Sequence, residues 1–302
     1  MSKHPRNQNR DRERSRNYHD RVAARYDSIY DDAYWDFHDH ITWNHLKPFL
    51  PRQTNLPVMD LGCGTGKWGL KLLKAGFPVT FADLANNMLQ EVRKKLAEWS
   101  AAPDLAAKAA RATLAQTDAV DLRAFPADHF ALITAMGDVV SICSDPARCL
   151  AEVHRILQPG GIFVFTIDNQ LAAIDHYIEA GNLAALADFV RTGRTQWLTP
   201  DAAERFPFRM FLPSQIDALT KRCGFEILSR IGKTVLPARH NRKLFDDPRA
   251  IDTLVDLETL LQKEPASAAR ASHLQLAARK PPLNAPAPAA TSQSPETPAV
   301  VP

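Results

Sequence analysis

The sequence of 302 residues lacks any apolar run that approaches the roughly 18 residues needed to cross a membrane. Its N-terminus also lacks the apolar core of a secretory signal. Cysteine is scarce, and the four residues show neither C-x-x-C spacing nor a metal-ligand pattern, so neither disulfides nor a metal centre is expected. We therefore expect a cytoplasmic protein with reduced thiols, no bound metal and no membrane partner.

Most of the chain also lacks an excess of charge of either sign. The net charge is +3, and residues 1–21 carry seven Lys or Arg against three Asp or Glu, so the remainder is close to neutral. This balance makes a nucleic-acid partner unlikely on composition alone. Residues 1–17, which have no apolar periodicity, predict a disordered basic leader whose arginines could contact phosphate but are more simply solvated. Residues 281–302 are rich in Pro, Ala, Ser and Thr and predict a disordered tail, which leaves one domain at 18–280.

The most informative stretch is VMDLGCGTG, residues 58–66. The apolar run at 57–61 predicts a short buried strand, and a helical pattern begins at Lys67. A strand, a glycine turn and a helix in this order bring backbone N–H groups and a helix N-terminus up to a ligand.

Two ligands compete for this turn. The segment 64–69 fits the G-x-G-x-x-G fingerprint of dinucleotide-binding enzymes. The longer string Asp60-x-Gly62-x-Gly64-x-Gly66 is more specific and resembles motif I of the class I S-adenosylmethionine (AdoMet) methyltransferases. A carboxylate at Asp60 favours a ligand with an ammonium and a sulfonium over a diphosphate, which supports AdoMet.

The resemblance extends over residues 18–280 and implies the family's α/β, Rossmann-like fold. We expect a seven-stranded sheet with six parallel strands and one antiparallel strand, helices on both faces, a helical N-terminal lid and an insertion after strand five. The runs that predict the strands are residues 57–61, 78–82, 112–116, 130–136, 162–167, 225–231 and 272–279.

Two strand ends supply the predicted nucleoside contacts. Asp83 ends the second strand about twenty residues after the glycine turn, where a carboxylate accepts both ribose hydroxyls or caps the next helix. The resemblance implies that Leu84 packs near the adenine, that Asp118 accepts from its amine and that the Ala119 N–H donates to its ring; Asp118 as a plain turn residue stays open. The predicted cofactor-binding residues are Tyr26, Asp60, Gly62, Cys63, Gly64, Gly66, Asp83, Leu84, Met88, Asp118, Ala119 and Met136.

Aromatic residues gather in the segment 18–50, which we expect to be a helical lid. Tyr26, Tyr30 and Tyr34 recur every four residues and predict one face of a helix, suited either to cover a small ligand or to pack on the sheet. The insertion at 170–212 is the predicted wall of the acceptor pocket.

No catalytic residue is defined by the sequence, and the weak candidates are Asp138, His176 and Tyr177. Asp138 follows the fourth strand, where the methyl group would meet its acceptor, and His176 beside Tyr177 could supply a general base. The chain lacks the Asn/Asp-Pro-Pro-aromatic motif of base-amino methyltransferases, the Pro-Cys nucleophile of cytosine-C5 enzymes and the paired glutamates of protein arginine methyltransferases.

The favoured interpretation is an AdoMet-dependent enzyme that methylates an N, O or C nucleophile of a small molecule, similar to the quinone and glycine N-methyltransferases. Three alternatives stay open: AdoMet chemistry on the aminocarboxypropyl arm, a non-catalytic AdoMet-binding partner protein and, least favoured, an NAD(P)-dependent oxidoreductase. The sequence does not define the oligomeric state.

Overall fold

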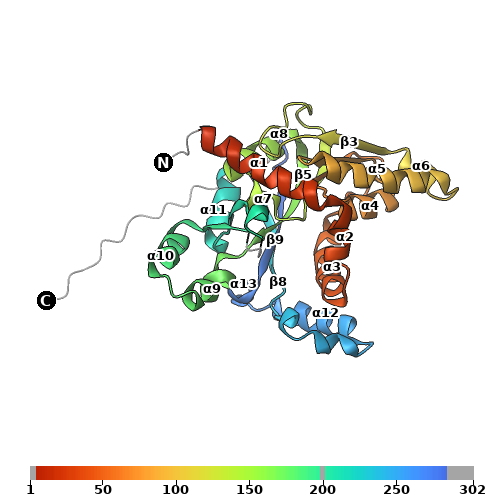
Figure 1. Ribbon diagram of the computed structural model, residues 1–302. Helices are drawn as coiled ribbons and strands as arrows, with labels where there is room; N and C mark the ends of the chain where they lie inside the picture. Colours follow the sequence, from red (N-terminus) through yellow and green to blue (C-terminus); the bar gives the residue numbers. More distant parts are fainter. Residues whose placement is uncertain (1–4, 198–200, 284–302) are drawn as a thin grey trace.

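The computed structural model describes residues 5–197 and 201–283, so the predicted disordered tail lies outside the described residues from 284 onward. A seven-stranded sheet with the order β3-β2-β1-β4-β5-β9-β8 forms the centre of the molecule (Figure 1). The strands are β1 Val58–Leu61, β2 Val79–Asp83, β3 Ala112–Gln116, β4 Phe130–Ala135, β5 Leu157–Asp168, β8 Glu226–Lys233 and β9 His273–Arg279.

The direction of the strands confirms the predicted topology. β1 pairs in parallel with β2 and β4, while β9 is antiparallel to both of its neighbours, β5 and β8. Six strands therefore run one way and one runs the other. All four residues of β1 are buried, as expected for a central parallel strand covered on both faces.

Helices cover both faces of the sheet, as predicted. One core lies under α8 (Pro146–Ile156) and α11 (Pro213–Arg222) and includes Phe163, Phe165 and Leu276. A second core, which includes Phe81, lies under α3, α4 and α5 on the other face. The other helices are α1 Pro5–Val22, α2 Tyr26–Ile29, α3 Ala33–Leu46, α4 Lys67–Lys74, α5 Asn86–Ala101, α6 Ala106–Ala109, α7 Val139–Ile142, α9 Ile174–Glu179, α10 Leu183–Thr192, α12 Ala250–Leu261 and α13 Ser267–Arg270. Among the described residues no helix has the length and apolar character of a membrane span.

The prediction of a disordered leader is wrong from residue 5 onward, because α1 is an 18-residue helix. Figure 1 shows α1 lying across the molecule beside α5. Its second half is anchored by Tyr18 and Val22, which are buried against Ala85 and Met88. Two apolar anchors one turn apart are enough to keep α1 helical, because the rest of the helix is rich in arginine, which is a good helix former.

The lid segment is helical but is not one continuous helix. The chain breaks between α2 and α3, where the Asp32 side chain caps α3 by accepting from the backbone N–H groups of Tyr34 and Trp35. The break separates Tyr34, which is buried against Phe37, from the earlier tyrosines. The predicted single face of three tyrosines is therefore wrong.

The insertion after β5 contains secondary structure that was not predicted. It carries α9, α10 and a separate two-stranded sheet of β6 (Arg194–Gln196) and β7 (Pro207–Arg209). This small sheet brings the insertion back to the carboxyl edge of the central strands, where Asn169 bridges to Phe211.

Candidate functional site

The glycine turn between β1 and α4 leaves no room for side chains. The backbone N–H groups of Gly62 and Cys63 both donate to the carbonyl of Ala82 on β2, at 2.7 and 3.1 Å. Gly62 has φ +64°, and a Cβ at this position would overlap the side chain of Val139. The turn therefore needs glycine both for its backbone angle and for its close approach to the end of β4.

Gly62→Ala is expected to destabilise the fold more than Gly160→Ala. Gly160 also has a positive φ, +81°, but nothing lies within 4 Å of a Cβ built there. The control thus reports only the cost of a left-handed backbone, about 1–2 kcal/mol, whereas Gly62→Ala adds the overlap with Val139. Urea unfolding of both variants measures the difference, and equal losses would show that Val139 moves freely.

Asp83 lies directly beside this turn. One carboxylate oxygen accepts from the Gly64 N–H at 2.8 Å and the other accepts from the Ala85 N–H at 2.9 Å. Burial raises the pKa of Asp83, and the backbone N–H of Ala85 opposes that shift. The carboxylate is thereby held at the wall of a cavity, with lone pairs left for the hydroxyls of a ligand.

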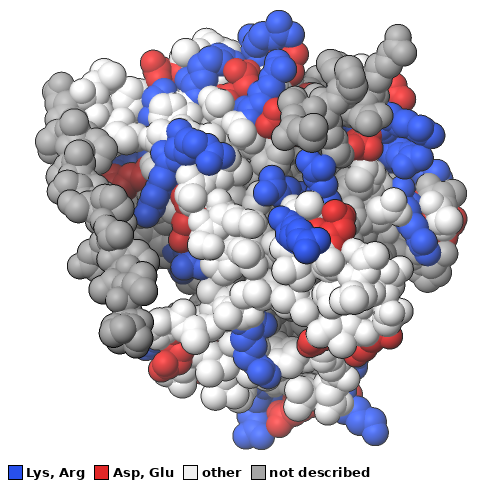
Figure 2. Space-filling model, turned by 90° about the vertical axis from the view of Figure 1, so that its left-hand side faces the viewer, with Lys and Arg blue, Asp and Glu red and all other residues white. Residues whose placement is uncertain are grey.

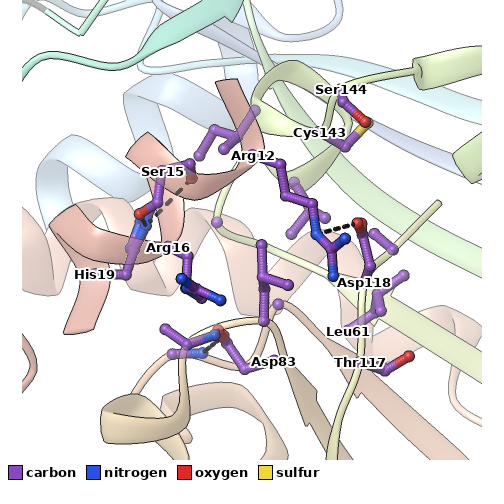
Figure 3. Close-up of a pocket in the computed structure, with 18 of the residues that line it drawn as sticks. Arg12, Ser15, Arg16, His19, Leu61, Asp83, Thr117, Asp118, Cys143 and Ser144 are labelled. Atoms are coloured by element: carbon purple, nitrogen blue, oxygen red, sulfur yellow. Dashed lines mark hydrogen bonds and ion pairs between the residues drawn. The ribbon is translucent and has the colours of Figure 1, made fainter. Parts of the chain in front are cut away.

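This cavity, here called the α1 cavity, is closed on one side by α1 (Figure 3). Arg12, Ser15, Arg16 and His19 of α1 line it. Figure 3 shows Arg12 and Arg16 reaching inward, Arg12 toward Asp118 and Arg16 toward the side of Asp83. Sequence reasoning missed these α1 residues because a helix so rich in arginine gave no apolar pattern.

The predicted adenine contacts lie in the α1 cavity together with the ribose carboxylate. Leu84, Asp118 and Ala119 line it. One carboxylate oxygen of Asp118 forms an ion pair with Arg12 at 2.8 Å, and the other oxygen accepts a hydrogen bond from the Val120 N–H at 3.1 Å. Its carboxylate is thus already engaged by α1, which the sequence did not predict.

The structure corrects the role expected of Asp60. Asp60 is only 1% exposed and is absent from the residues that line the α1 cavity. One oxygen accepts from the Gly69 N–H at 2.7 Å, and the other accepts from the Thr134 hydroxyl at 3.0 Å. Asp60 therefore ties α4 to β4 and does not face a ligand, so its charge does not select the cofactor.

The remaining residues predicted to bind the cofactor fall into two groups, those that line a cavity and those that are buried away from both. Cys63, Gly64 and Tyr26 line a cavity, as does Met136 at the end of β4. Two predicted residues do not face either cavity: Met88 is completely buried in the core beneath α1, and Gly66 begins α4 with φ +90°.

A second cavity of about 430 Å³, here called the aromatic cavity, adjoins the first at the glycine turn. Both the lid and the insertion supply residues that line it. The rings of Tyr26 and Tyr30 lie 4.9 Å apart, and those of Trp197 and Phe206 are stacked at 6.0 Å. Its aromatic residues are Tyr18, Tyr26, Tyr30, Trp35, Trp68, Trp197, Phe206 and Phe208.

Asp138 is the catalytic candidate that does reach this cavity. It has φ +55°, an unfavourable angle for a residue with a side chain, at the carboxyl end of β4. Its backbone N–H donates to Thr166, while its buried Oδ1 has no hydrogen-bond partner among the described residues. A strained residue with one unpartnered carboxylate oxygen at this edge is suited to contact a ligand.

A row of titratable side chains, which we call the polar row, lies beside Asp138. Asp168, His273 and Lys233 face one another in register across β5, β9 and β8. His273 Nε2 is 3.6 Å from Asp168 and 3.9 Å from Asp138. Sequence reasoning missed the row because strand register brings together three residues that lie far apart in the chain.

Burial and charge set the protonation of the polar row. Burial lowers the pKa of His273 to about 4 and that of Lys233 to about 8. Burial and the neighbouring Asp138 carboxylate raise the pKa of Asp168 well above its usual range. Asp138, Asp168 and His273 offer ligand atoms within 4.8 Å of one another, a grouping that could hold a metal, but the buried ammonium of Lys233 disfavours a second cation there.

The other two catalytic candidates are misplaced. His176 and Tyr177 lie on α9 and are not among the residues lining the aromatic cavity. The Tyr177 hydroxyl is hydrogen-bonded to Thr195 at 2.6 Å, and its ring stacks on Phe189 at 4.3 Å. Tyr177 therefore holds the insertion together, and the general base expected at His176 and Tyr177 stays an untested prediction.

The residues of the α1 cavity fit AdoMet. The Asp83 carboxylate is positioned for two hydroxyls, and the turn at Gly62 and Gly64 offers backbone without side chains. Met136 and Cys63 line the aromatic cavity next to Gly137, Gly62 and Gly64, which line both cavities. A pyrophosphate would find no arginine or lysine in the turn itself.

Comparisons with known proteins agree with this assignment. Residues 58–161 match a family described as a methyltransferase domain. Over 275 residues the chain is 24% identical to a tRNA 5-carboxymethoxyuridine methyltransferase of Escherichia coli (strain K12), covering 88% of this chain and 97% of the relative. Over 226 residues it is 29% identical to a ubiquinone/menaquinone biosynthesis C-methyltransferase of Acidiphilium cryptum, covering 72% and 85%.

Solved structures show the same fold. A SAM-dependent methyltransferase from Methanosarcina mazei superposes with a TM-score of 0.55 at 19% identity, covering 79% of this chain and 97% of that one. The matched domain and the relatives support an S-adenosylmethionine-dependent methyltransferase, and the sheet order and the solved structure show that it has the class I fold.

Proposed function

We propose that this enzyme methylates a nitrogen, oxygen or carbon nucleophile of a small molecule held in the aromatic cavity. AdoMet supplies a methyl group on a positive sulfonium, which an acceptor lone pair displaces in line, releasing a neutral thioether. The observation that carries the proposal is that the two cavities share Gly62, Gly64 and Tyr26, so that cofactor and acceptor sites meet. Positioning supplies most of the catalysis in such a reaction.

The chain's own residues have defined parts in this proposal. The aromatic walls exclude water and orient a planar acceptor, because aromatic rings prefer to stack on flat groups. Asp138 contacts the acceptor. A proton released by the acceptor passes to the uncharged ring of His273, whose Nε2 lies 3.6 Å from the Asp168 carboxyl group.

Asp138→Asn is expected to lower kcat/KM for methyl transfer about 10- to 100-fold, the loss of one charge-assisted hydrogen bond. Affinity for S-adenosylhomocysteine should stay unchanged, because Asp138 does not line the α1 cavity. His176→Ala is the control, since this residue lies away from both cavities. Equal activities of the two variants would remove Asp138 from the acceptor site.

A nucleoside within a tRNA is the second candidate acceptor. The relative that acts on a tRNA uridine matches this chain over nearly its whole length. A base is planar and would suit the aromatic cavity, and α1, which flanks both cavities, is rich in arginine.

Methyl-labelled AdoMet incubated separately with a small-metabolite extract and with total RNA distinguishes the two acceptors. A parallel reaction with AdoMet labelled in its carboxyl group reports transfer of the aminocarboxypropyl arm. Label from the methyl group alone is the expected result, and label from the carboxyl group would contradict methyl transfer. Calorimetry with S-adenosylhomocysteine and NAD(H) tests the cofactor independently.

A further inference from the structure

One face of α1 carries a stripe of arginines. Arg10, Arg14, Asn17 and Arg21 are spaced at i, i+4, i+7 and i+11, which places them on one side of the helix. None of the three arginines forms an ion pair with the part of the chain that the structure describes. By contrast, Arg12, on the neighbouring face, is paired with Asp118. Within residues 5–197 and 201–283, the three arginines of the stripe therefore have no ion-pair partner.

The stripe forms one wall of a groove. Arg14, Asn17 and Arg21 line a hollow whose opposite wall is Gln196, Ala202 and Arg205 of the insertion. We call these six residues the arginine groove. Arg14 and Arg21 place two positive charges along one wall of this groove, so the groove suits a negatively charged ligand.

The groove leads to the aromatic cavity. Gln196 and Arg205 are each followed directly in the chain by a residue of that cavity, Trp197 and Phe206. On the α1 side, the ring of Tyr18 lies 5.1 Å from that of Phe206 and so closes the boundary between groove and cavity. Figure 2 shows the adjoining side of the molecule, where Lys and Arg side chains are spread over the upper half among fewer Asp and Glu.

We propose that the arginine groove binds the phosphate backbone of an RNA whose target base stacks in the aromatic cavity. This rests on the second acceptor named above and deepens it by naming the surface that holds the substrate. Arginine is the side chain best suited to phosphate because its planar fork donates two hydrogen bonds at once. From Arg10 to Arg21 the stripe is about 16 Å long, enough to meet several phosphates of one strand.

The shape of the surface favours RNA over other polyanions. A membrane-surface helix would need an apolar face open to the lipid, but the buried apolar residues of α1, Tyr18 and Val22, pack against the protein. An acidic protein would not explain why an aromatic cavity, a stacking platform for unpaired bases, opens beside the cations.

The test compares Arg14→Glu/Arg21→Glu with Arg52→Glu/Arg249→Glu, a double variant with the same charge change. Arg52 precedes β1, and Arg249 precedes α12. Figure 1 shows α12 at the opposite end of the molecule from α1. Fluorescence anisotropy with total tRNA and with heparin is recorded between 50 and 200 mM salt. S-adenosylhomocysteine affinity and RNA labelling by methyl-labelled AdoMet are measured for each protein.

The expected result is a loss of tRNA affinity of at least about 10-fold and a salt slope smaller by about two in the groove variant only. RNA labelling should fall with it, while S-adenosylhomocysteine affinity stays unchanged. Equal tRNA affinities of the two variants, or heparin bound as tightly as tRNA, would overturn the proposal that the arginine groove binds RNA. A wild-type protein that fails to bind S-adenosylhomocysteine would instead overturn the cofactor assignment, so the two failures are distinguishable.

Discussion

Asp83→Ala is expected to weaken the binding of S-adenosylhomocysteine by roughly 1–3 kcal/mol, or about 5- to 150-fold. The carboxylate is buried in the wall of the α1 cavity and is held there by the backbone N–H groups of Gly64 and Ala85. Alanine removes the acceptor of the ribose hydroxyls and also leaves those two N–H groups without their partner. Titration calorimetry of both proteins measures the change.

Asp83→Asn separates these two effects. Asparagine keeps one carbonyl oxygen and the shape of the side chain but has no charge. The affinity of Asp83→Asn for S-adenosylhomocysteine should therefore lie between those of wild type and Asp83→Ala. Asp121→Ala serves as the control, because that exposed carboxylate is paired only with its neighbour Arg123. An affinity of Asp83→Ala equal to that of wild type would remove Asp83 from the cofactor site.

The parts of the fold that follow from local pattern were predictable. β1, β3 and β4 are short apolar runs bounded by turn residues, and the structure begins and ends them within a residue or two of the expected positions. The glycine turn and Asp83 were predictable for the same reason, because their chemistry depends on spacing along a single strand–turn–helix unit. The side of the α1 cavity formed by the ends of β1 and β2 could therefore be predicted from the sequence, whereas the side formed by α1 could not.

The acceptor side could not be predicted, because it is assembled from distant segments. The polar row exists only because strand register places Asp168 and Lys233 on either side of His273. Likewise, α1 is helical through its packing on α5 and through the Arg12–Asp118 pair, neither of which is visible in local composition. Tyr177, which looked catalytic from the sequence, is engaged in the packing of the insertion through Thr195 and Phe189.

Asp60 shows how a correct motif supported an incorrect mechanism. The motif identified the family, but the carboxylate was expected to face the ligand, whereas it lies buried between Gly69 and Thr134. Burial raises the pKa of Asp60 to about 7, above the usual value near 4. The reason for an acid at this position is therefore structural, and its protonation state is coupled to folding.

This coupling predicts a pH-dependent stability difference between wild type and Asp60→Asn. Between pH 4 and 7 the folded protein holds a proton on Asp60 that the unfolded chain has already released, so folding is favoured at the acid end. That contribution is lost as pH rises through the folded pKa, in total roughly 4 kcal/mol over three pH units. Asparagine keeps an acceptor for Gly69 and does not titrate, so the stability of wild type should fall relative to the variant.

Urea unfolding of both proteins from pH 5 to 8 measures this difference, because titrating groups that do not interact with Asp60 cancel. We expect the free energy of unfolding of wild type to decline relative to Asp60→Asn mostly between pH 5 and 7, and then to stay level. Asp121→Asn, at an exposed carboxylate, should instead run parallel to wild type throughout. A constant difference for Asp60→Asn would mean that the N-terminus of α4 keeps Asp60 ionised, because its backbone dipoles would then outweigh the cost of burial.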